Sequence, residues 1–270
     1  MAALTRRLED ALESRKERQM FRTLDRPEDD SEQLVDLSSN DYLSLAHNRQ
    51  LRHSFLQALQ DGVRSPYGPP SSRLLDGNSD LHRLLEFRLS SFFRSESALL
   101  FNSGYDANVG LWTCLPGPHD YILYDGYVHA STHDGMRASR VSKDRRISFR
   151  HNDASDLERQ IKHYLSQDEK LGRGTSSVWI AVESLYSMDG DLAPLARLID
   201  TIERILPNGN GHLVVDEAHA TGLYGENGRG VVCALGLANR ALVRVHTFGK
   251  SMACTGGTSD QTVSLCRALY

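Results

Sequence analysis

Short apolar runs alternate with longer amphipathic stretches over most of the chain. The apolar runs have the length of buried strands, and the stretches between them repeat apolar residues at helical spacing. This alternation predicts βαβ units and a mostly parallel sheet. We expect strands at 98–101, 121–124, 147–150, 177–183, 212–216 and 242–247, helices at 79–93, 129–138, 156–166 and 194–206, and one more helix beginning after residue 103.

The segment before residue 79 has a different pattern. Leu4, Leu8 and Leu12 recur every four positions among charged residues, which predicts an amphipathic helix over 4–20. The polar segment 25–32 indicates a connector, and 51–60 has a helical pattern. The stretch 64–78 is rich in Gly, Pro and Ser, so we expect a long loop there rather than a helix.

The composition argues against several classes of protein. With 270 residues, 40% hydrophobic and 24% charged, the chain is expected to form one large or two small globular domains. The net charge of −4 argues against nucleic-acid binding, which needs a basic surface. No apolar run approaches the ~20 residues of a bilayer span, so we expect no membrane insertion.

The cysteines point to a reducing compartment. The four of them form no CxxC pair, which argues against zinc ribbons and thiol redox motifs. Reduced thiols are typical of intracellular proteins. We expect a cytoplasmic location, with the peroxisome and the mitochondrion as alternatives, because neither a signal peptide nor a peroxisomal tripeptide is visible.

Reactive or unusual side chains stand near the ends of four expected strands. Ligands of parallel sheets bind outside the carboxyl ends of the strands, so we expect these side chains to lie together. Taken singly, each has an ordinary alternative: Gly104 as a turn residue, His129 as a plain histidine and Lys250 as a surface lysine. The full set is Gly104 and Tyr105, Asp125 and His129, Asp216 and His219, and Thr247 and Lys250.

The sequence DEAH at 216–219 does not fit the magnesium site of a nucleotide hydrolase. Such a site needs an upstream G-x-x-x-x-G-K-[ST] loop, whereas Gly-Lys-Ser at 249–251 lies downstream and Arg244 stands where the first glycine belongs. The glycines at 225, 228 and 230 have the wrong spacing for dinucleotide binding. The chain also lacks H-E-x-x-H and G-x-S-x-G, so a zinc protease and an α/β-hydrolase are unsupported.

Lys250 and Asp216 together fit the needs of pyridoxal 5′-phosphate (PLP). This cofactor requires a lysine amine for its aldehyde, an acid at its ring nitrogen and a cup for its phosphate. Asp216 precedes Lys250 by 34 residues, which is one strand–helix–strand excursion. The other parts would come from a phosphate-binding helix start at Gly104-Tyr105, the hydroxyl of Thr247 and, for stacking on the ring, His129.

Seven strings of the sequence resemble the α-oxoamine synthases, which are fold-type I PLP enzymes that condense an amino acid with an acyl-CoA. The resemblance covers about 36–257 and is greatest to the 8-amino-7-oxononanoate synthases. It implies an α/β fold, a three-layer αβα large domain with a mostly parallel sheet. The strings are NDYL at 40–43, SSRLLDG at 71–77, FNSGYDAN at 101–108, YDGYVHASTHDGMRAS at 124–139, ESLYSMDGDLAPL at 183–195, VVDEAHATGLYGENGRG at 214–230 and TFGK at 247–250.

The resemblance also implies a role for each matching residue, and it implies no metal. Lys250 would bind PLP as a Schiff base and later move the Cα proton of the substrate. Asp216 would pair with the ring nitrogen, His129 would stack on the ring, and His219 would bond to the phenolic oxygen side. The remaining positions are Gly104, Tyr105, Ser187 and Thr247 around the cofactor, and Arg22 for substrate binding.

The implied activity is that of an acyl-CoA:amino acid C-acyltransferase, which carries out a decarboxylating condensation. The expected substrates are L-alanine and pimeloyl-CoA, or pimeloyl-acyl carrier protein, in biotin biosynthesis. The expected assembly is a homodimer, with neither nucleic acid nor membrane as a partner. Two alternatives stay open: another α-oxoamine synthase such as glycine C-acetyltransferase, and an inactive remnant or interaction protein that keeps the cofactor motifs.

The resemblance ends after Gly257, although members of the family continue well beyond this point. We therefore expect a C-terminally truncated chain without the small C-terminal domain. Its expected parts are an N-terminal helix and connector (1–45), an incomplete PLP-binding large domain (46–257) and a divergent tail (258–270). We also expect the antiparallel strand of the family's sheet to be missing, with 262–266 as a poor substitute, and the sheet to have an open edge.

Overall fold

The computed structural model describes residues 2–24, 35–62 and 68–269. The chain divides into two units, Met1–Ser39 and Asn40–Tyr270, so the first division falls six residues before the expected boundary at 45. In the first unit, α1 (Ala2–Glu17) confirms the amphipathic helix expected from the leucine spacing. The expected connector at 25–32 lies outside the described residues, and so do residues 64–67 at the start of the expected long loop.

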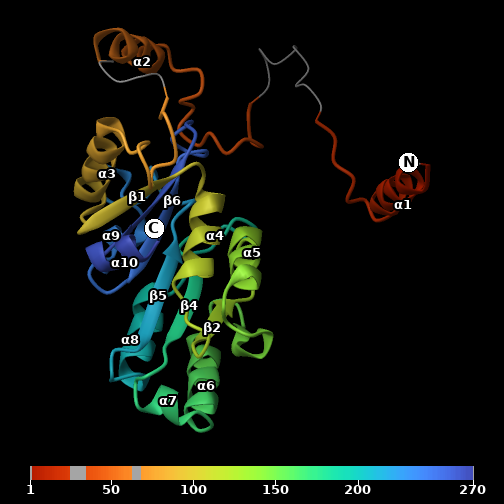
Figure 1. Cartoon of the computed structure of the whole chain (residues 1–270), viewed down its shortest axis with the longest axis vertical. Coiled ribbons are helices and arrows are strands. Elements are labelled where there is room, and N and C mark those ends of the chain that lie inside the picture. The colour runs from red at the N-terminus through yellow and green to blue at the C-terminus, as the bar shows by residue number, and fades with distance from the viewer. Residues whose placement is uncertain (1, 25–34, 63–67, 270) are drawn as a thin grey trace. The chain divides into compact units, whose positions relative to one another are not determined.

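The second unit is built on a seven-stranded sheet (Figure 1). The strand order is β1-β7-β6-β5-β4-β2-β3, and the strands run parallel except β7, which is antiparallel to both of its neighbours. All six strands expected from the apolar runs are confirmed to within a few residues. The bounds are β1 (Ser97–Phe101), β2 (Tyr121–Asp125), β3 (Arg146–Phe149), β4 (Val178–Glu183), β5 (Gly211–Asp216), β6 (Val243–Thr247) and β7 (Gly257–Gln261).

Helices cover both faces of the sheet, which confirms the three-layer αβα architecture. Side chains alternate along β4, so Ile180 packs against α6 and α8, whereas Trp179 and Ala181 face α4 and α5. Figure 1 shows α4 and α5 running beside each other on one side of the sheet. The bounds are α2 (Arg49–Gly62), α3 (Asp80–Phe93), α4 (Gly104–Cys114), α5 (Ala130–Ala138), α6 (Ala154–Leu165), α7 (Glu169–Gly172), α8 (Leu195–Ile205), α9 (Val231–Ala234) and α10 (Val263–Ala268), with 3₁₀ turns η2 (Lys143–Arg145) and η3 (Glu226–Gly228).

The expectation of a missing antiparallel strand is wrong. Residues Gly257–Gln261 form β7 between β1 and β6, so the strand crosses the expected domain boundary at 257. Residues 263–268, which overlap the poor substitute, form α10 instead. The strand shows no apolar pattern because its side chains Thr258, Ser259, Asp260 and Gln261 are polar, although all four are buried. Pairing of the backbone on both edges, rather than side-chain pattern, places this segment in the sheet.

The polar strand carries a buried ion pair. Asp260 on β7 contacts the guanidinium of Arg244 on β6, and both side chains are almost inaccessible to water. His246 Nε2 lies 3.3 Å from the other carboxylate oxygen of Asp260. A buried charge without a partner destabilises the folded state. The carboxylate of Asp260 therefore offsets the cost of burying the Arg244 charge inside the sheet.

Replacing Asp260 by alanine is expected to lower the free energy of unfolding by about 3–5 kcal/mol, since it leaves the Arg244 charge buried and uncompensated. Urea denaturation measures this change. Asp200→Ala serves as the control, because Asp200 pairs with Arg240 at the surface with its side chain 68% exposed. The control should cost less than about 1 kcal/mol. Equal losses in the two variants would contradict this account of β7.

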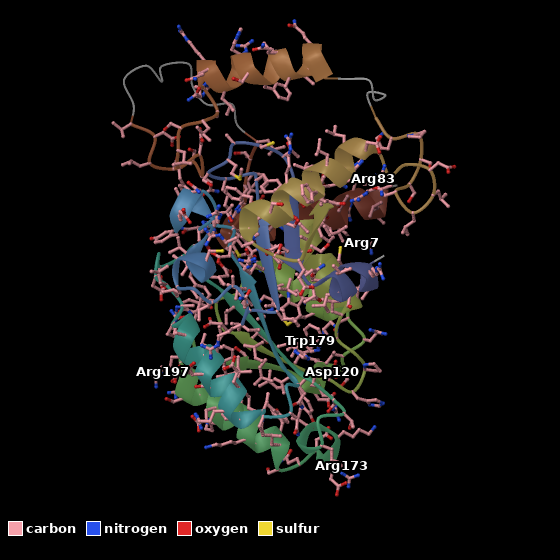
Figure 2. All side chains as sticks on the ribbon, turned by 90° about the vertical axis from the view of Figure 1, so that its left-hand side faces the viewer. Arg7, Arg83, Asp120, Arg173, Trp179 and Arg197 are labelled. Carbon is pink, nitrogen blue, oxygen red and sulfur yellow. The ribbon has the colours of Figure 1, made fainter. Side chains whose placement is uncertain are left out.

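At the amino end of the sheet, hydrogen bonds to Asp120 join the segments that enter β2 and β4. Asp120, just before β2, accepts hydrogen bonds from Ser177 N (2.8 Å) and from Trp179 Nε1 (3.0 Å) next to it on β4. Figure 2 shows Asp120 and Trp179 close together. The reactive residues expected from the sequence lie at the opposite, carboxyl end of the strands.

Candidate active site

Seven of the nine expected site residues line one cavity of about 220 Å³ at the carboxyl ends of the strands. Because Lys250 and Asp216 both face it, the main expectation from the sequence is met. A larger hollow of about 530 Å³ borders Gly211 and Leu242 at the amino ends of β5 and β6, away from these residues. The seven are Gly104, Tyr105, His129, Asp216, His219, Thr247 and Lys250.

Lys250 begins a chain of polar contacts. Its Nζ lies 2.7 Å from Nε2 of His219, and Nδ1 of the same ring lies 2.8 Å from the hydroxyl of Tyr42. The Tyr42 hydroxyl donates to Oδ1 of Asn40 at 3.0 Å. A neutral His219 that accepts from Lys250 and donates to Tyr42 satisfies every contact in this chain.

Burial lowers the pKa of both groups in the contact between Lys250 and His219. Burial lowers the pKa of Lys250, although the nearby carboxylates of Asp216 and Glu183 oppose the shift. Burial, and then the positive charge of Lys250, lower the pKa of His219 to about 4. His219 is therefore a neutral hydrogen-bond acceptor at pH 7, and more of Lys250 is in the nucleophilic amine form than for a lysine in water.

Asp216 is held rigidly at the end of β5. Its Oδ2 accepts from Asn108 Nδ2 at 2.7 Å, and its Oδ1 accepts from Ala218 N at 2.8 Å. The residue is only 8% exposed. Asn108, one turn inside α4, also donates to Ser131 at 3.1 Å. The carboxylate is thus aimed by two donors and stays acceptor-only toward the cavity.

The N-terminus of α4 forms another part of the cavity wall. Ser103 caps this helix by accepting from Asp106 N at 3.0 Å, and the first intrahelical bond runs from Ala107 N to Ser103 O. The N–H groups of Gly104 and Tyr105 precede that bond, at the positive end of the helix dipole. A Cβ on Gly104 would lie 2.7 Å from Cβ of Thr247, so only glycine lets β6 and α4 approach this closely.

His129 stands at the N-cap of α5. Its Nδ1 lies 2.8 Å from Ser131 Oγ and accepts from Ser131 N at 3.2 Å, which fixes the orientation of the ring. The Tyr105 ring meets it edge-on with centroids 6.0 Å apart. Residue His129 therefore presents a fixed flat ring at the cavity wall.

Glu183 is a cavity residue that the sequence reasoning missed. It ends β4 in register with Asp216 on β5, it lines the cavity, and it is only 4% exposed. The backbone N–H of His129 acts on its carboxylate in the opposite direction to burial and lowers its pKa. Burial, and then the charge of Asp216, raise the pKa of Glu183 to about 8. Its position at the end of an apolar strand was the signal, by the same rule that found Asp216.

Glu183 makes stability depend on pH. A carboxyl group with a raised folded-state pKa contributes stability that is fully present below its unfolded pKa and is lost as the pH rises through the folded pKa. We therefore expect the free energy of unfolding to fall between about pH 4.5 and about pH 8, and to fall less in Glu183→Gln. Urea titrations across this range measure both slopes. The surface variant Asp200→Asn should match the wild type, and a Glu183→Gln curve parallel to the wild-type curve would refute the assignment.

Two expected residues are not in the cavity lining. Ser187 is exposed in the β4–α8 connection, and Arg22 lies in the separate first unit. Their roles therefore stay predictions. Besides Glu183, the structure adds lining residues that the sequence analysis did not single out, namely Ser103, Asn108, Ser131 and Ala218.

Two kinds of site do not occur in the described parts of the chain. No helix there is long and apolar enough to cross a membrane. No three His, Cys, Asp or Glu side chains in the same residues are grouped so that they could hold a metal ion.

Known proteins resemble this chain in both sequence and structure. The family described as aminotransferase class I and II matches residues 32–264. An 8-amino-7-oxononanoate synthase of Emericella nidulans is 46% identical over 87% of this chain and 58% of its own length. The aminoacyl transferase sphA of Aspergillus fumigatus is 39% identical over 93% of this chain and 53% of its own length. The chain thus spans about half the length of the curated relatives it matches.

Two solved structures are similar to this chain over most of its length. A serine palmitoyltransferase from S. paucimobilis with bound PLP–myriocin aldimine superposes with a TM-score of 0.72 at 29% identity, covering 86% of this chain and 55% of that one. The 8-amino-7-oxononanoate synthase of Francisella tularensis superposes with a TM-score of 0.66 at 25% identity, covering 88% of this chain and 61% of that one.

Proposed function

We infer the function from one premise: the chain belongs to the aminotransferase class I and II family. We propose that it binds PLP in the cavity of Lys250 and Asp216 and takes part in an acyl transfer to an amino acid. The observation that carries the proposal is the meeting of a half-buried lysine amine and a fixed carboxylate in one cavity beside a helix N-terminus.

The residues present fit this cofactor. Lys250 supplies the amine for its aldehyde, and Asp216 supplies the acid for its ring nitrogen. Gly104, Tyr105 and Thr247 form a cup for a phosphate, since the N–H groups at the helix start favour an anion. Oδ1 of the buried Asn108 has no hydrogen-bond partner among the described residues, so the wall beside Asp216 keeps an acceptor available.

The side chains divide the chemistry between them. PLP, when bound, supplies an electron sink that stabilises a carbanion at the Cα of an amino acid. Lys250 Nζ can take a proton from that carbon, since burial favours its uncharged form. His219 accepts a hydrogen bond from Nζ, and Tyr42 in turn orients His219. His129 lines the cavity with its flat ring, on which the cofactor ring would stack.

The relatives suggest the substrates. We propose an acyl thioester and a small amino acid, and we favour L-alanine with a pimeloyl thioester because the 8-amino-7-oxononanoate synthase of Emericella nidulans is 46% identical. The sphA and serine palmitoyltransferase likenesses support a second candidate, in which another amino acid and a longer acyl chain are used. A homodimer is proposed as the assembly.

Two measurements test the function. Adding PLP to the purified chain should produce the absorption band of a lysine-bound cofactor, and acyl-CoA with L-alanine should then release free thiol. L-serine in place of L-alanine distinguishes the two substrate classes. Binding of PLP without thiol release from any pair would favour the alternative of an inactive remnant, and absence of PLP binding would overturn the proposal.

A further inference from the structure

Beside the cavity, three loops meet at one histidine. Nδ1 of His151 lies 2.8 Å from Oδ1 of Asp125, and Nε2 lies 2.9 Å from Oδ2 of Asp191. Asp125 ends β2, His151 follows β3, and Asp191 stands in the β4–α8 connection. One imidazole therefore joins the carboxyl ends of three neighbouring strands, outside the lining of the cavity.

Each ring nitrogen lies within hydrogen-bond distance of a carboxylate oxygen, and Nε2 also lies 3.2 Å from Nδ2 of Asn152. The two carboxylates favour the imidazolium. A neutral imidazole has a single N–H and can donate to only one of two carboxylates, whereas an imidazolium donates to both. The carboxylates are themselves held as acceptors. Asp125 accepts from Tyr127 N (2.9 Å) and Asn152 N (2.8 Å), and Asp191 accepts from Asn152 Nδ2 (2.6 Å).

The other groups packed against the ring are two tyrosines. Tyr127 stacks on His151 with centroids 4.2 Å apart, and Tyr186 meets it edge-on at 4.5 Å. The titratable groups facing the imidazole are thus two carboxyls and two phenols. Burial lowers the pKa of His151, but its bonds to Asp125 and Asp191 outweigh this effect and the net shift is upward. Burial also raises the pKa of Tyr186, so the phenol of Tyr186 does not compete for the charge.

Two site residues lie close in sequence to the cluster of Asp125, His151 and Asp191, which we call the clamp. His129 follows Asp125 by four positions, and Asp191 follows Glu183 by eight, in the connection that begins where β4 ends. The β2–α5 loop and the β4–α8 connection can separate only if one of the His151 contacts breaks. Residue Asn152 supports both sides, because its left-handed backbone (φ 54°) lets its N–H reach Asp125 while its side chain reaches Asp191.

We propose that His151 is a positioning residue, which as an imidazolium fastens the loop before His129 to the connection after Glu183, and which releases one of the two loops when it loses its proton. The cavity wall formed by His129 is then fixed at neutral pH and loosened in alkali. The link to PLP rests on the proposed function, whereas the charged clamp itself does not.

The first test is an NMR titration of the chain without cofactor. His151 ring signals, assigned by their loss in His151→Gln, should show both nitrogens protonated at pH 7. They should titrate above the ordinary histidine value and shift to lower pH in Asp191→Asn. Asp191 is half-exposed, so this variant keeps the fold, and Asp200→Asn is the matched surface control that should leave the titration unchanged. A neutral ring at pH 7, or identical titrations in Asp191→Asn and wild type, would overturn the clamp.

The second test asks whether the clamp acts on the cavity. PLP dissociation constants measured against pH should rise in wild type as the imidazolium loses its proton. His151→Gln should bind PLP roughly tenfold more weakly at neutral pH, with a flattened pH profile, because one charge-assisted bond is gone. Equal affinity and equal profiles in both proteins would overturn the positioning role. Failure of wild type to bind PLP would instead refute the proposed function, and the NMR titration would still decide the clamp.

Discussion

Replacing Lys250 by alanine is expected to abolish covalent attachment of PLP and to lower thiol release by more than about 10³-fold, the scale of loss for a group that acts as the covalent nucleophile. The reason is structural: Lys250 is the amine that the fold buries in the cavity, and burial lowers its pKa toward the nucleophilic form. Reduction with borohydride followed by peptide mass analysis locates the modified lysine. Absorption spectra of the two proteins with PLP give the second measurement.

Lys170→Ala is the matched control for that substitution. Lys170 is exposed on α7, at the other end of the sheet, so its loss should change neither the absorption nor the site of modification. An unchanged cofactor spectrum in Lys250→Ala would refute the assignment of this lysine, and with it the proposed function.

Replacing Asp216 by asparagine is expected to lower kcat by about 10²- to 10³-fold and to weaken PLP binding much less. The substitution keeps the shape of the side chain but removes the negative charge that would hold a proton on the ring nitrogen. In a buried site, loss of one charged partner typically costs ~3–5 kcal/mol. Two donors aim the Asp216 carboxylate, Asn108 Nδ2 at 2.7 Å and Ala218 N at 2.8 Å, so its position is set before any ligand arrives.

Kinetics with saturating PLP separate the charge effect from simple loss of cofactor. Asp120→Asn is the matched control, since Asp120 accepts hydrogen bonds at the amino end of the sheet and does not line the cavity. It should lower stability while leaving kcat near the wild-type value. An Asp216→Asn protein with wild-type kcat would show that the charge is not used.

The apolar pattern predicted most of the fold because each strand and helix carries its own local signal. Short apolar runs such as Val178–Val182 are strands in the structure, and the turn at Gly104 begins a helix. Strand β7 carried no such signal. Its buried polar residues, Asp260 above all, are stabilised by a partner on another strand, Arg244, and that pairing cannot be deduced from the sequence of either segment alone.

Only part of the candidate site could be predicted from the sequence, for the same reason. Lys250, Asp216 and His129 stand near strand ends as reactive residue types, so the rule for parallel sheets found them. Tyr42 was missed as a contact because 177 residues separate it from His219. Glu183 was missed as a site residue because a glutamate at a strand end is commonly a solvated surface group; its proximity to Asp216 depends on the register of β4 against β5.

By itself, the sequence determined the order of the six apolar strands and of the main helices between them, the α/β class and the residue types at the carboxyl edge of the sheet. These follow from side-chain periodicity and chain connectivity, which are local properties. The tertiary structure decided which charged groups lie next to one another: Glu183 beside Asp216, His151 between Asp125 and Asp191, and Asp260 against Arg244. The cost of burying a charge depends on every neighbour that folding brings to it, and those neighbours come from distant parts of the chain.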